Sequence, residues 1–207
     1  MWPNCQGPRS HYHVMQRLDS MPATRSHKCT YEEYCLLPDD GQRYEVLDGK
    51  VVVSPAAGSD HQGIQIALAH HLYTAIDERR RGRVFTDIDC HLLAHDIVRP
   101  DLVVVLPAHT HRIIATHIVG TPDLAIEILS PSTAARDRTS KKHRYEVAGT
   151  PELWIVDGRK RTVAQFVHDG RRFGPAIVHT AKIRLAILPK VEIPLREVWS
   201  KGTSGAS

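Results

Sequence analysis

The chain has 207 residues, which is enough for one well-packed domain and too few for two domains of ordinary size. Hydrophobic residues make up 42% and charged residues 24%, as in ordinary globular proteins, and no apolar run approaches the roughly 20 residues that span a bilayer. The net charge is +4, but residues 1–30 carry four basic residues against one acidic residue, so the remaining 177 residues are nearly neutral. Binding of a polyanion would therefore need local basic patches.

The two ends of the chain differ in composition from its middle. Residues 1–28 are polar and aperiodic, and we expect a disordered segment there. We expect residues 29–200 to form one domain and residues 201–207 a flexible tail. The N-terminus lacks the apolar stretch of a signal peptide, which favours a cytoplasmic protein. None of the four cysteines forms a C-x-x-C pair, so free thiols are expected.

The first half of the domain carries clear local signals. Residues 30–33 have the form of a capping box, which predicts a short helix. Asp48-Gly49 predicts a type I′ hairpin between strands at 44–47 and 50–54. A helix is expected from Gly58 onward. Its apolar stripe repeats every four residues, at Ile64, Leu68, Leu72 and Ile76.

The second half alternates strands with a further helix. Strands are predicted at about 83–93, 99–106 and 123–129, and the 107–122 connection is predicted to be an exposed loop. A helix at about 134–148 should end at Gly149, and strands are predicted at 152–157, 162–168, near 183–188 and at 191–193. This order predicts an α/β (mixed α+β) fold with one central sheet flanked by helices.

Two acidic residues lie within apolar runs, where an unpaired carboxylate is costly. Asp101 opens one buried strand, and Glu127 lies inside another, on the face opposite to Ile126 and Ile128. Carboxylates kept in such places are paired, protonated or bound to a metal. Asp101 could pair with Arg99 and Glu127 with a basic residue, or both could be ligands for Mg²⁺.

Short motifs along residues 30–200 together resemble the Uma family of restriction-endonuclease-like proteins. They are Glu45-Val46-Leu47-Asp48-Gly49, His61-Gln62, Arg99-Pro100-Asp101, Glu127-Ile128-Leu129-Ser130-Pro131-Ser132-Thr133, Asp137, Lys141, Tyr145 and Glu152-Leu153-Trp154-Ile155-Val156-Asp157. The resemblance implies a restriction-endonuclease-like central mixed β-sheet flanked by helices. It also implies a divalent-metal nuclease centre of the PD-(D/E)xK superfamily.

The third catalytic group departs from the superfamily pattern. That pattern usually has a lysine two residues after the acid, where this chain has Leu129. The Uma family resembles a variant with the lysine on the following helix, which implies Lys141. Asp137, Lys141 and Tyr145 are spaced by four and share a helical face, so Lys141 could activate the attacking water. A solvated Asp–Lys pair is the alternative.

Other residues complete the predicted site. The family position of Glu45 implies a further acid near the metal, and a solvent-facing strand residue is the alternative. His61 could contact the phosphate or the metal-bound water, or make local hydrogen bonds at the helix start. Arg136, Arg138, Lys142 and Arg144 are weaker candidates for phosphate contacts.

We therefore predict a Mg²⁺-dependent (or Mn²⁺-dependent) DNA endonuclease, with Asp101 and Glu127 as metal ligands. The alternative is a catalytically silent nucleic-acid- or protein-binding module on the same fold. A homodimer is expected because double-strand cleavage needs two centres. Walker A and G-x-G-x-x-G motifs do not occur, so no nucleotide cofactor is predicted. No apolar run is long enough to span a bilayer, so no membrane partner is predicted.

Overall fold

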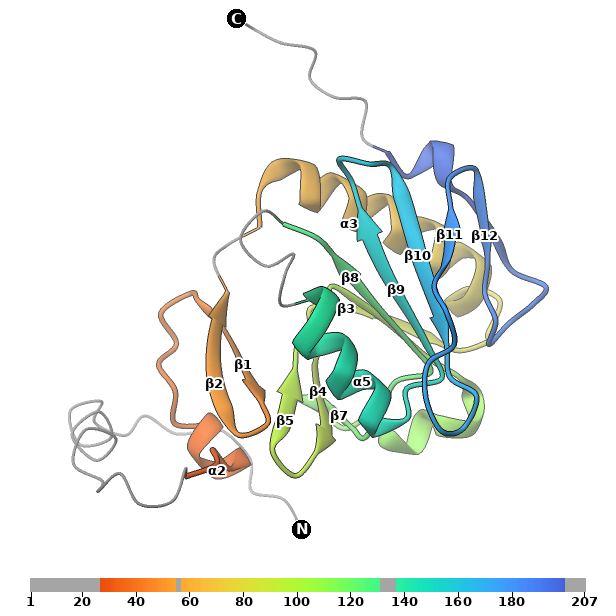
Figure 1. Cartoon of the computed structure of the whole chain (residues 1–207). Helices are drawn as coiled ribbons and strands as arrows, with labels where there is room; N and C mark the ends of the chain where they lie inside the picture. The colour runs from red at the N-terminus through yellow and green to blue at the C-terminus, as the bar shows by residue number, and fades with distance from the viewer. Residues whose placement is uncertain (1–26, 55–56, 131–136, 200–207) are drawn as a thin grey trace, which may run out of the picture.

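A mixed six-stranded sheet forms the centre of the molecule, with helices on its two sides (Figure 1). The computed structural model describes residues 27–54, 57–130 and 137–199 of the chain. Within these residues the strand order of the central sheet is β11-β10-β9-β8-β6-β3, and only β8 and β9 run parallel. The strands are β3 (Arg83–Thr86), β6 (Leu102–Val105), β8 (Leu124–Ile128), β9 (Glu152–Asp157), β10 (Thr162–Val167) and β11 (Ile177–His179).

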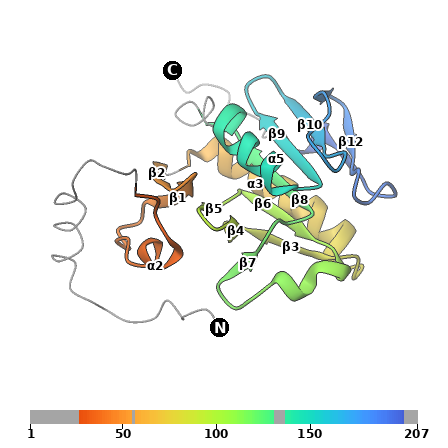
Figure 2. The ribbon, with the colours of Figure 1, turned by 60° about the horizontal axis from the view of Figure 1, so that its bottom comes forward.

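Two smaller sheets accompany the central one. The five-stranded sheet has the order β2-β1-β5-β4-β7, and Figure 2 shows its β1–β2 hairpin set off to one side of the body. β12 and β13 form a separate antiparallel pair. The strands are β1 (Arg43–Leu47), β2 (Lys50–Ser54), β4 (Asp89–Leu93), β5 (Asp96–Val98), β7 (His117–Val119), β12 (Lys182–Arg184) and β13 (Glu192–Pro194).

The helices are few, and two of them matter most for the site. The α-helices are α2 (Tyr31–Tyr34), α3 (Ser59–Leu72) and α5 (Lys142–Ala148). π-helical turns η1 (Tyr73–Asp77) and η3 (Asp137–Lys141) adjoin α3 and α5, and 3₁₀ turns are η2 (Pro107–Arg112) and η4 (Leu195–Glu197). None of the described helices combines the length and the apolar character needed to cross a membrane.

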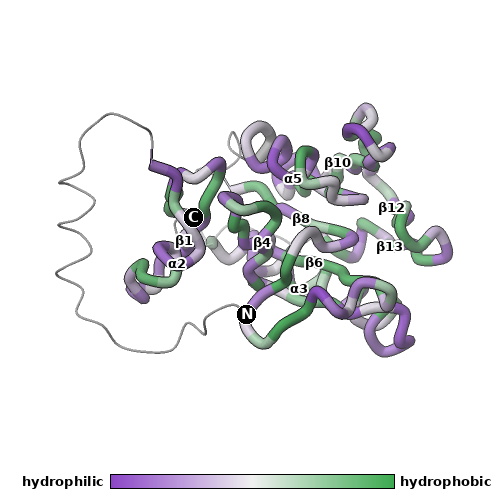
Figure 3. The backbone as a smooth tube through the Cα atoms, turned by 90° about the horizontal axis from the view of Figure 1, so that it is seen from below, coloured by the Kyte–Doolittle hydropathy of each residue, from purple (hydrophilic) through white to green (hydrophobic). Residues whose placement is uncertain are grey.

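The two faces of the central sheet are buried against different elements, because side chains alternate along each strand. Ile126 and Ile128 join the core under α3, whereas Ala125 and Leu129 lie in the core that contains Tyr145 of α5. Glu127 therefore lies on the face opposite to Ile126 and Ile128, as predicted, and that face packs against α5. Figure 3 shows apolar (green) stretches in central strands such as β6, with polar (purple) segments mainly toward the outside.

Several local predictions are confirmed. Thr30 caps α2 in a capping box with Glu33. Asp48 and Gly49 both have positive φ, 50° and 79°, as a type I′ turn requires. The apolar stripe of α3 and η1 is buried, and Gly149 ends α5 with a left-handed conformation. The mixed fold with a central sheet flanked by helices is the one predicted.

Other predictions need correction. The strand expected at 83–93 is two strands, β3 and β4, in different sheets, and the chain turns between them at Asp87 with a φ of 50°. The loop expected at 107–122 includes β7, in which His117 is buried against Tyr31. Cys29 and Cys90 are free, but Cys35 is disulfide-bonded, so free thiols were the wrong expectation for Cys35.

The predicted domain limits are only partly within the described residues. Residues 1–26 and 200–207, including most of the predicted disordered segment and the tail, lie outside them. His27 and Lys28, assigned to that segment, are placed. The His27 Nε2 lies 2.7 Å from Glu33 Oε1, and Lys28 Nζ lies 2.6 Å from Asp48 Oδ1. These two contacts join His27 and Lys28 to α2 and to the β1–β2 turn.

Candidate active site

The two predicted acids lie side by side where β6 and β8 meet. β6 and β8 are antiparallel, with Leu102 opposite Ile126 and Val103 opposite Ala125. The same register places Asp101, just before β6, opposite Glu127. The Ile128 amide donates to Asp101 Oδ2 at 2.7 Å and fixes this arrangement. Both carboxylates are 3% exposed.

The Glu127 carboxylate binds a lysine and a tyrosine from the helical segment that follows it. Lys141 Nζ lies 2.7 Å from each Glu127 oxygen, and the Tyr145 hydroxyl donates to Glu127 Oε1 at 2.6 Å. The two residues are four apart, so the helical period brings them to the same carboxylate. Burial, followed by the charge of Glu127, raises the pKa of Tyr145 well above its usual value, so its hydroxyl stays protonated.

Glu45 of the hairpin joins the same cluster. Its Oε1 lies 2.9 Å from Lys141 Nζ and accepts the Arg99 amide at 2.8 Å. Glu45 is 2% exposed and Lys141 3% exposed. The buried ammonium group therefore lies between two buried carboxylates. Glu45 therefore does not face solvent, and Lys141 is not solvated; both alternatives considered from the sequence were wrong on this point.

Asp101 is held from two other elements. Arg43 Nη1 of β1 donates to Asp101 Oδ1 at 3.1 Å, and His61 Nε2 of α3 lies 3.2 Å from Oδ2. Arg99, the partner considered from the sequence, instead donates to Asp89 at 2.6 Å. Burial raises the pKa of Asp101, but the His61 hydrogen bond and charge and the Ile128 amide lower it more. The net pKa is lowered, so Asp101 is ionised.

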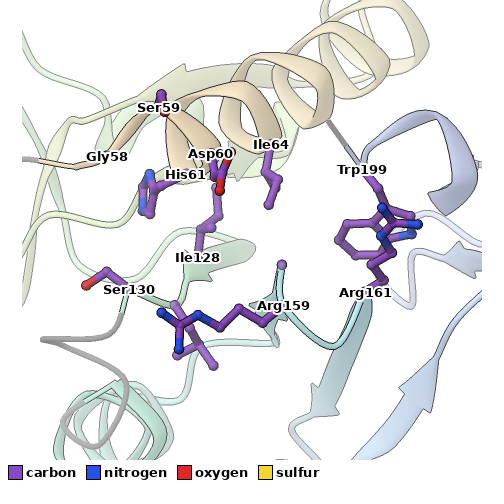
Figure 4. A pocket seen from close by; sticks show the side chains of 12 residues that line it. Gly58, Ser59, Asp60, His61, Ile64, Ile128, Ser130, Arg159, Arg161 and Trp199 are labelled. Carbon is purple, nitrogen blue, oxygen red and sulfur yellow. The ribbon is translucent and has the colours of Figure 1, made fainter. Parts of the chain in front are cut away.

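A pocket of about 450 Å³ lies between the start of α3, the end of β8 and the turn after β9 (Figure 4). Its wall includes His61 and Ile128, which both contact Asp101. The side chain of His61 is 9% exposed, and its Nδ1 is buried without a hydrogen-bond partner among the described residues. The pocket is therefore one residue away from Asp101, through His61 and Ile128.

The structure does not bring all the predicted phosphate contacts to this site. Lys142 Nζ lies 4.8 Å from the ring centroid of Phe166. Arg144 binds the buried Asp96 with its Nε at 2.7 Å and with Nη2, which ties α5 to β5. Arg136 lies outside the described residues, and the side chains of Asp137 and Arg138 are not described.

Two residues of the site were missed from the sequence. Arg43 precedes Glu45 by two positions, so strand alternation places both on one face, and that signal could have found it. Gln65 follows His61 by four positions on α3 and donates to the Asp101 carbonyl at 2.9 Å. Both signals depend on first accepting that Glu45 and His61 point inward.

The donor set suits a small, hard cation. Among the described residues no group of three His, Cys, Asp or Glu side chains is arranged to hold a metal. Mg²⁺, however, is commonly held by one or two carboxylates together with waters and substrate phosphates. The adjacent Asp101 and Glu127 fit that requirement, and they do not fit a zinc site, which needs more protein ligands.

The mixed sheet, the adjacent buried acids and the lysine from the following helix match what the resemblance to restriction-endonuclease-like proteins implied. The chain belongs to the Uma2 family, described as "Putative restriction endonuclease", whose family model matches residues 31–196. It is therefore a member of a nuclease family.

Comparison with solved structures supports the fold. The chain is similar to a crystal structure described as "a putative nuclease belonging to DUF820" from Anabaena variabilis ATCC 29413. The two are 21% identical, the match covers 83% of this chain and 97% of that one, and the TM-score is 0.70. No curated protein matches the chain.

Proposed function

We propose that the protein is a Mg²⁺-dependent (or Mn²⁺-dependent) endonuclease that hydrolyses phosphodiester bonds in DNA. The observation that carries the proposal is the buried cluster of Glu127, Lys141 and Glu45 beside Asp101, at the edge of a pocket. Burying charges costs several kcal/mol per ion, so a solely structural cluster would be an expensive way to hold a sheet together. Membership of a nuclease family supports the same conclusion.

The residues divide the work according to their positions. Asp101 and Glu127 would hold the cation, which when bound neutralises phosphate charge and lowers the pKa of a water. Lys141 would orient the attacking water and stabilise the charge that develops on the phosphate. Glu45 and Tyr145 position Lys141 and Glu127, because they bind these groups directly.

The reaction needs a proton donor for the leaving group. Water oxygen forms a bond to phosphorus and gives up one proton, the bond from phosphorus to one sugar oxygen breaks, and that sugar oxygen takes up one proton. His61 lines the pocket and contacts Asp101, so it is placed to hold a proton near the reacting phosphate. Asp101 orients the ring, because its Oδ2 lies 3.2 Å from His61 Nε2.

A second function is favoured by one observation. Lys141 already occupies both oxygens of Glu127, as it would in a binding module that has lost its metal. Such a protein would bind nucleic acid or another protein without turnover. A cleavage assay distinguishes the two functions. The enzyme would cut its substrate when a divalent cation is present, and the binding module would not cut it at all.

The test is cleavage of supercoiled DNA, linear DNA and RNA with Mg²⁺, with Mn²⁺ and with a chelator. Wild-type protein should cut DNA only with a divalent cation, and Asp101→Asn and Glu127→Gln should abolish cutting. The matched control is Glu78→Gln, because Glu78 is an exposed acid at the far end of the α3–η1 helix. A Glu127→Gln protein as active as wild type would reject the proposal, and metal-independent binding without cleavage would favour the second function.

A further inference from the structure

We propose that Arg159 and Arg161 form a phosphate-binding subsite that holds the nucleic-acid backbone beside the bond to be cleaved. The identity of the ligand as nucleic acid rests on the proposed function. The location of the subsite rests on the pocket next to Asp101, whose lining includes both arginines. Neither the resemblance nor the predicted phosphate contacts pointed to this turn.

The arginines come from the turn between β9 and β10, which reads Gly158-Arg159-Lys160-Arg161. Both are exposed, and neither forms an ion pair with a described residue. Figure 4 shows Arg159 extending across the pocket toward Ser130, whereas Arg161 lies beside Trp199. Two guanidinium groups with no ion-pair partner in the described part of the chain therefore border one cavity.

The opposite wall of the pocket also suits an anion. It is the N-terminus of α3, a helix of 14 residues whose N-cap, Gly58, provides no side-chain cap. The first amide groups of such a helix lack partners within the helix and favour negative charge. His61 on the same wall carries a buried Nδ1 without a partner among the described residues. The helix terminus and the two arginines thus act on the same space.

The balance of charge favours a phosphate over a cation or a neutral ligand. Among the residues that the structure describes, Asp60 is the one carboxylate that lines the pocket, against the two arginines. A planar guanidinium binds phosphate oxygens through paired hydrogen bonds, which a lysine cannot do. His61 and Ile128 line the pocket and contact Asp101. A phosphate bound in the pocket would therefore lie next to the scissile phosphate at Asp101 and Glu127.

The test measures DNA binding without cleavage. A labelled duplex is titrated with protein in chelator, and fluorescence anisotropy gives the binding constant as NaCl is raised. The double variant Arg159→Gln/Arg161→Gln should flatten the slope of log K against log salt by about 0.9 for each lost contact, or about two in all. Arg159→Lys/Arg161→Lys should restore most of the slope, because the charge returns.

The matched control is Arg171→Gln/Arg172→Gln, which removes the same charge from the exposed turn at the other end of β10. It should leave the slope within about 0.5 of wild type, since each phosphate contact contributes about 0.9. If the two double variants change the slope equally, the subsite is rejected. If the Arg159→Gln/Arg161→Gln protein does not fold, each single variant should give about half the change.

Failure of the subsite and failure of the proposed function give different results. Metal-dependent cleavage with an unchanged salt slope would reject the subsite and keep the nuclease. An arginine-dependent slope in a protein that never cleaves would keep the subsite and reject the nuclease. A wild-type protein that binds neither DNA nor RNA would overturn both.

Discussion

Lys141 is the residue on which the site is centred. Its ammonium group contacts Glu127 and Glu45, and its charge also contributes to the lowered pKa of Asp101. A buried ion pair is weak evidence for stability by itself, because desolvation offsets the attraction. Removing Lys141 would nevertheless destabilise the fold, because the acids that remain would be buried with no ammonium group between them.

We predict that Lys141→Ala abolishes cleavage and lowers the free energy of unfolding by about 3–5 kcal/mol, because Glu45 and Glu127 lose their shared counter-charge. The adjacent Lys142→Ala is the control. Lys142 lies over Phe166, so its loss should cost about 0.5–1 kcal/mol and leave cleavage in place. Urea denaturation and plasmid cleavage give the two measurements. Equal activity of Lys141→Ala and wild type would remove Lys141 from the reaction.

At the scale of elements, the β1–β2 hairpin carries two of the site residues. Arg43 and Glu45 lie on one face of β1 and reach Asp101 and Lys141, respectively. The turn of the hairpin is anchored as well, because the Gly49 amide donates to the His95 carbonyl and the Cys29 amide donates to the Gly49 carbonyl, both at 2.8 Å. The position of the acid thus depends on a tight turn remote from the reaction.

We predict that Gly49→Ala destabilises the protein by more than Gly41→Ala does. Both glycines have a φ of +79°, so a left-handed residue costs either variant about 1–2 kcal/mol. At Gly49 the added Cβ would also lie 2.7 Å from the Lys28 Cα, whereas nothing lies within 4 Å at Gly41. Chemical denaturation of the two variants measures the difference. Equal losses would show that the Lys28 segment moves aside at no cost.

At the scale of the whole molecule, the acids join elements that are far apart in sequence. Asp101 and Glu127 lie at the ends of central strands, His61 on α3 and Lys141 at the start of the α5 helix. A ligand that binds these groups only in the folded state must stabilise the entire domain. Metal binding can therefore be measured through unfolding, without any substrate.

We predict that Mg²⁺ or Mn²⁺ raises the melting temperature of wild-type protein. At about one hundred times Kd the gain is about 2.7 kcal/mol, which for a domain of this size corresponds to about 5–10 °C. Asp101→Asn and Glu127→Gln should lose the effect, and Glu78→Gln should keep it. A melting temperature that metal does not change in wild type, or changes equally in Asp101→Asn, would contradict the assignment of the ligands.

The sequence by itself determined the features that depend on local periodicity. Turn chemistry predicted the Asp48-Gly49 hairpin, and four-residue spacing predicted the buried stripe of α3. Strand alternation predicted which face Glu127 occupies, and helical spacing predicted that Lys141 and Tyr145 act together. These features involve neighbours along the chain, so the covalent geometry of strand and helix is enough to predict them.

Only the tertiary structure decided which charged side chains lie at the site and which bind other residues. Lys142 and Arg144 have the charge of phosphate ligands, yet Phe166 and Asp96 bind them. Arg159 and Arg161 lie in an ordinary surface turn of the sequence, and only the packing of β9 and β10 near α3 places them at the pocket. The physical reason is that Coulomb and hydrogen-bond energies depend on distance in space, which strand pairing and helix packing set across long separations in sequence.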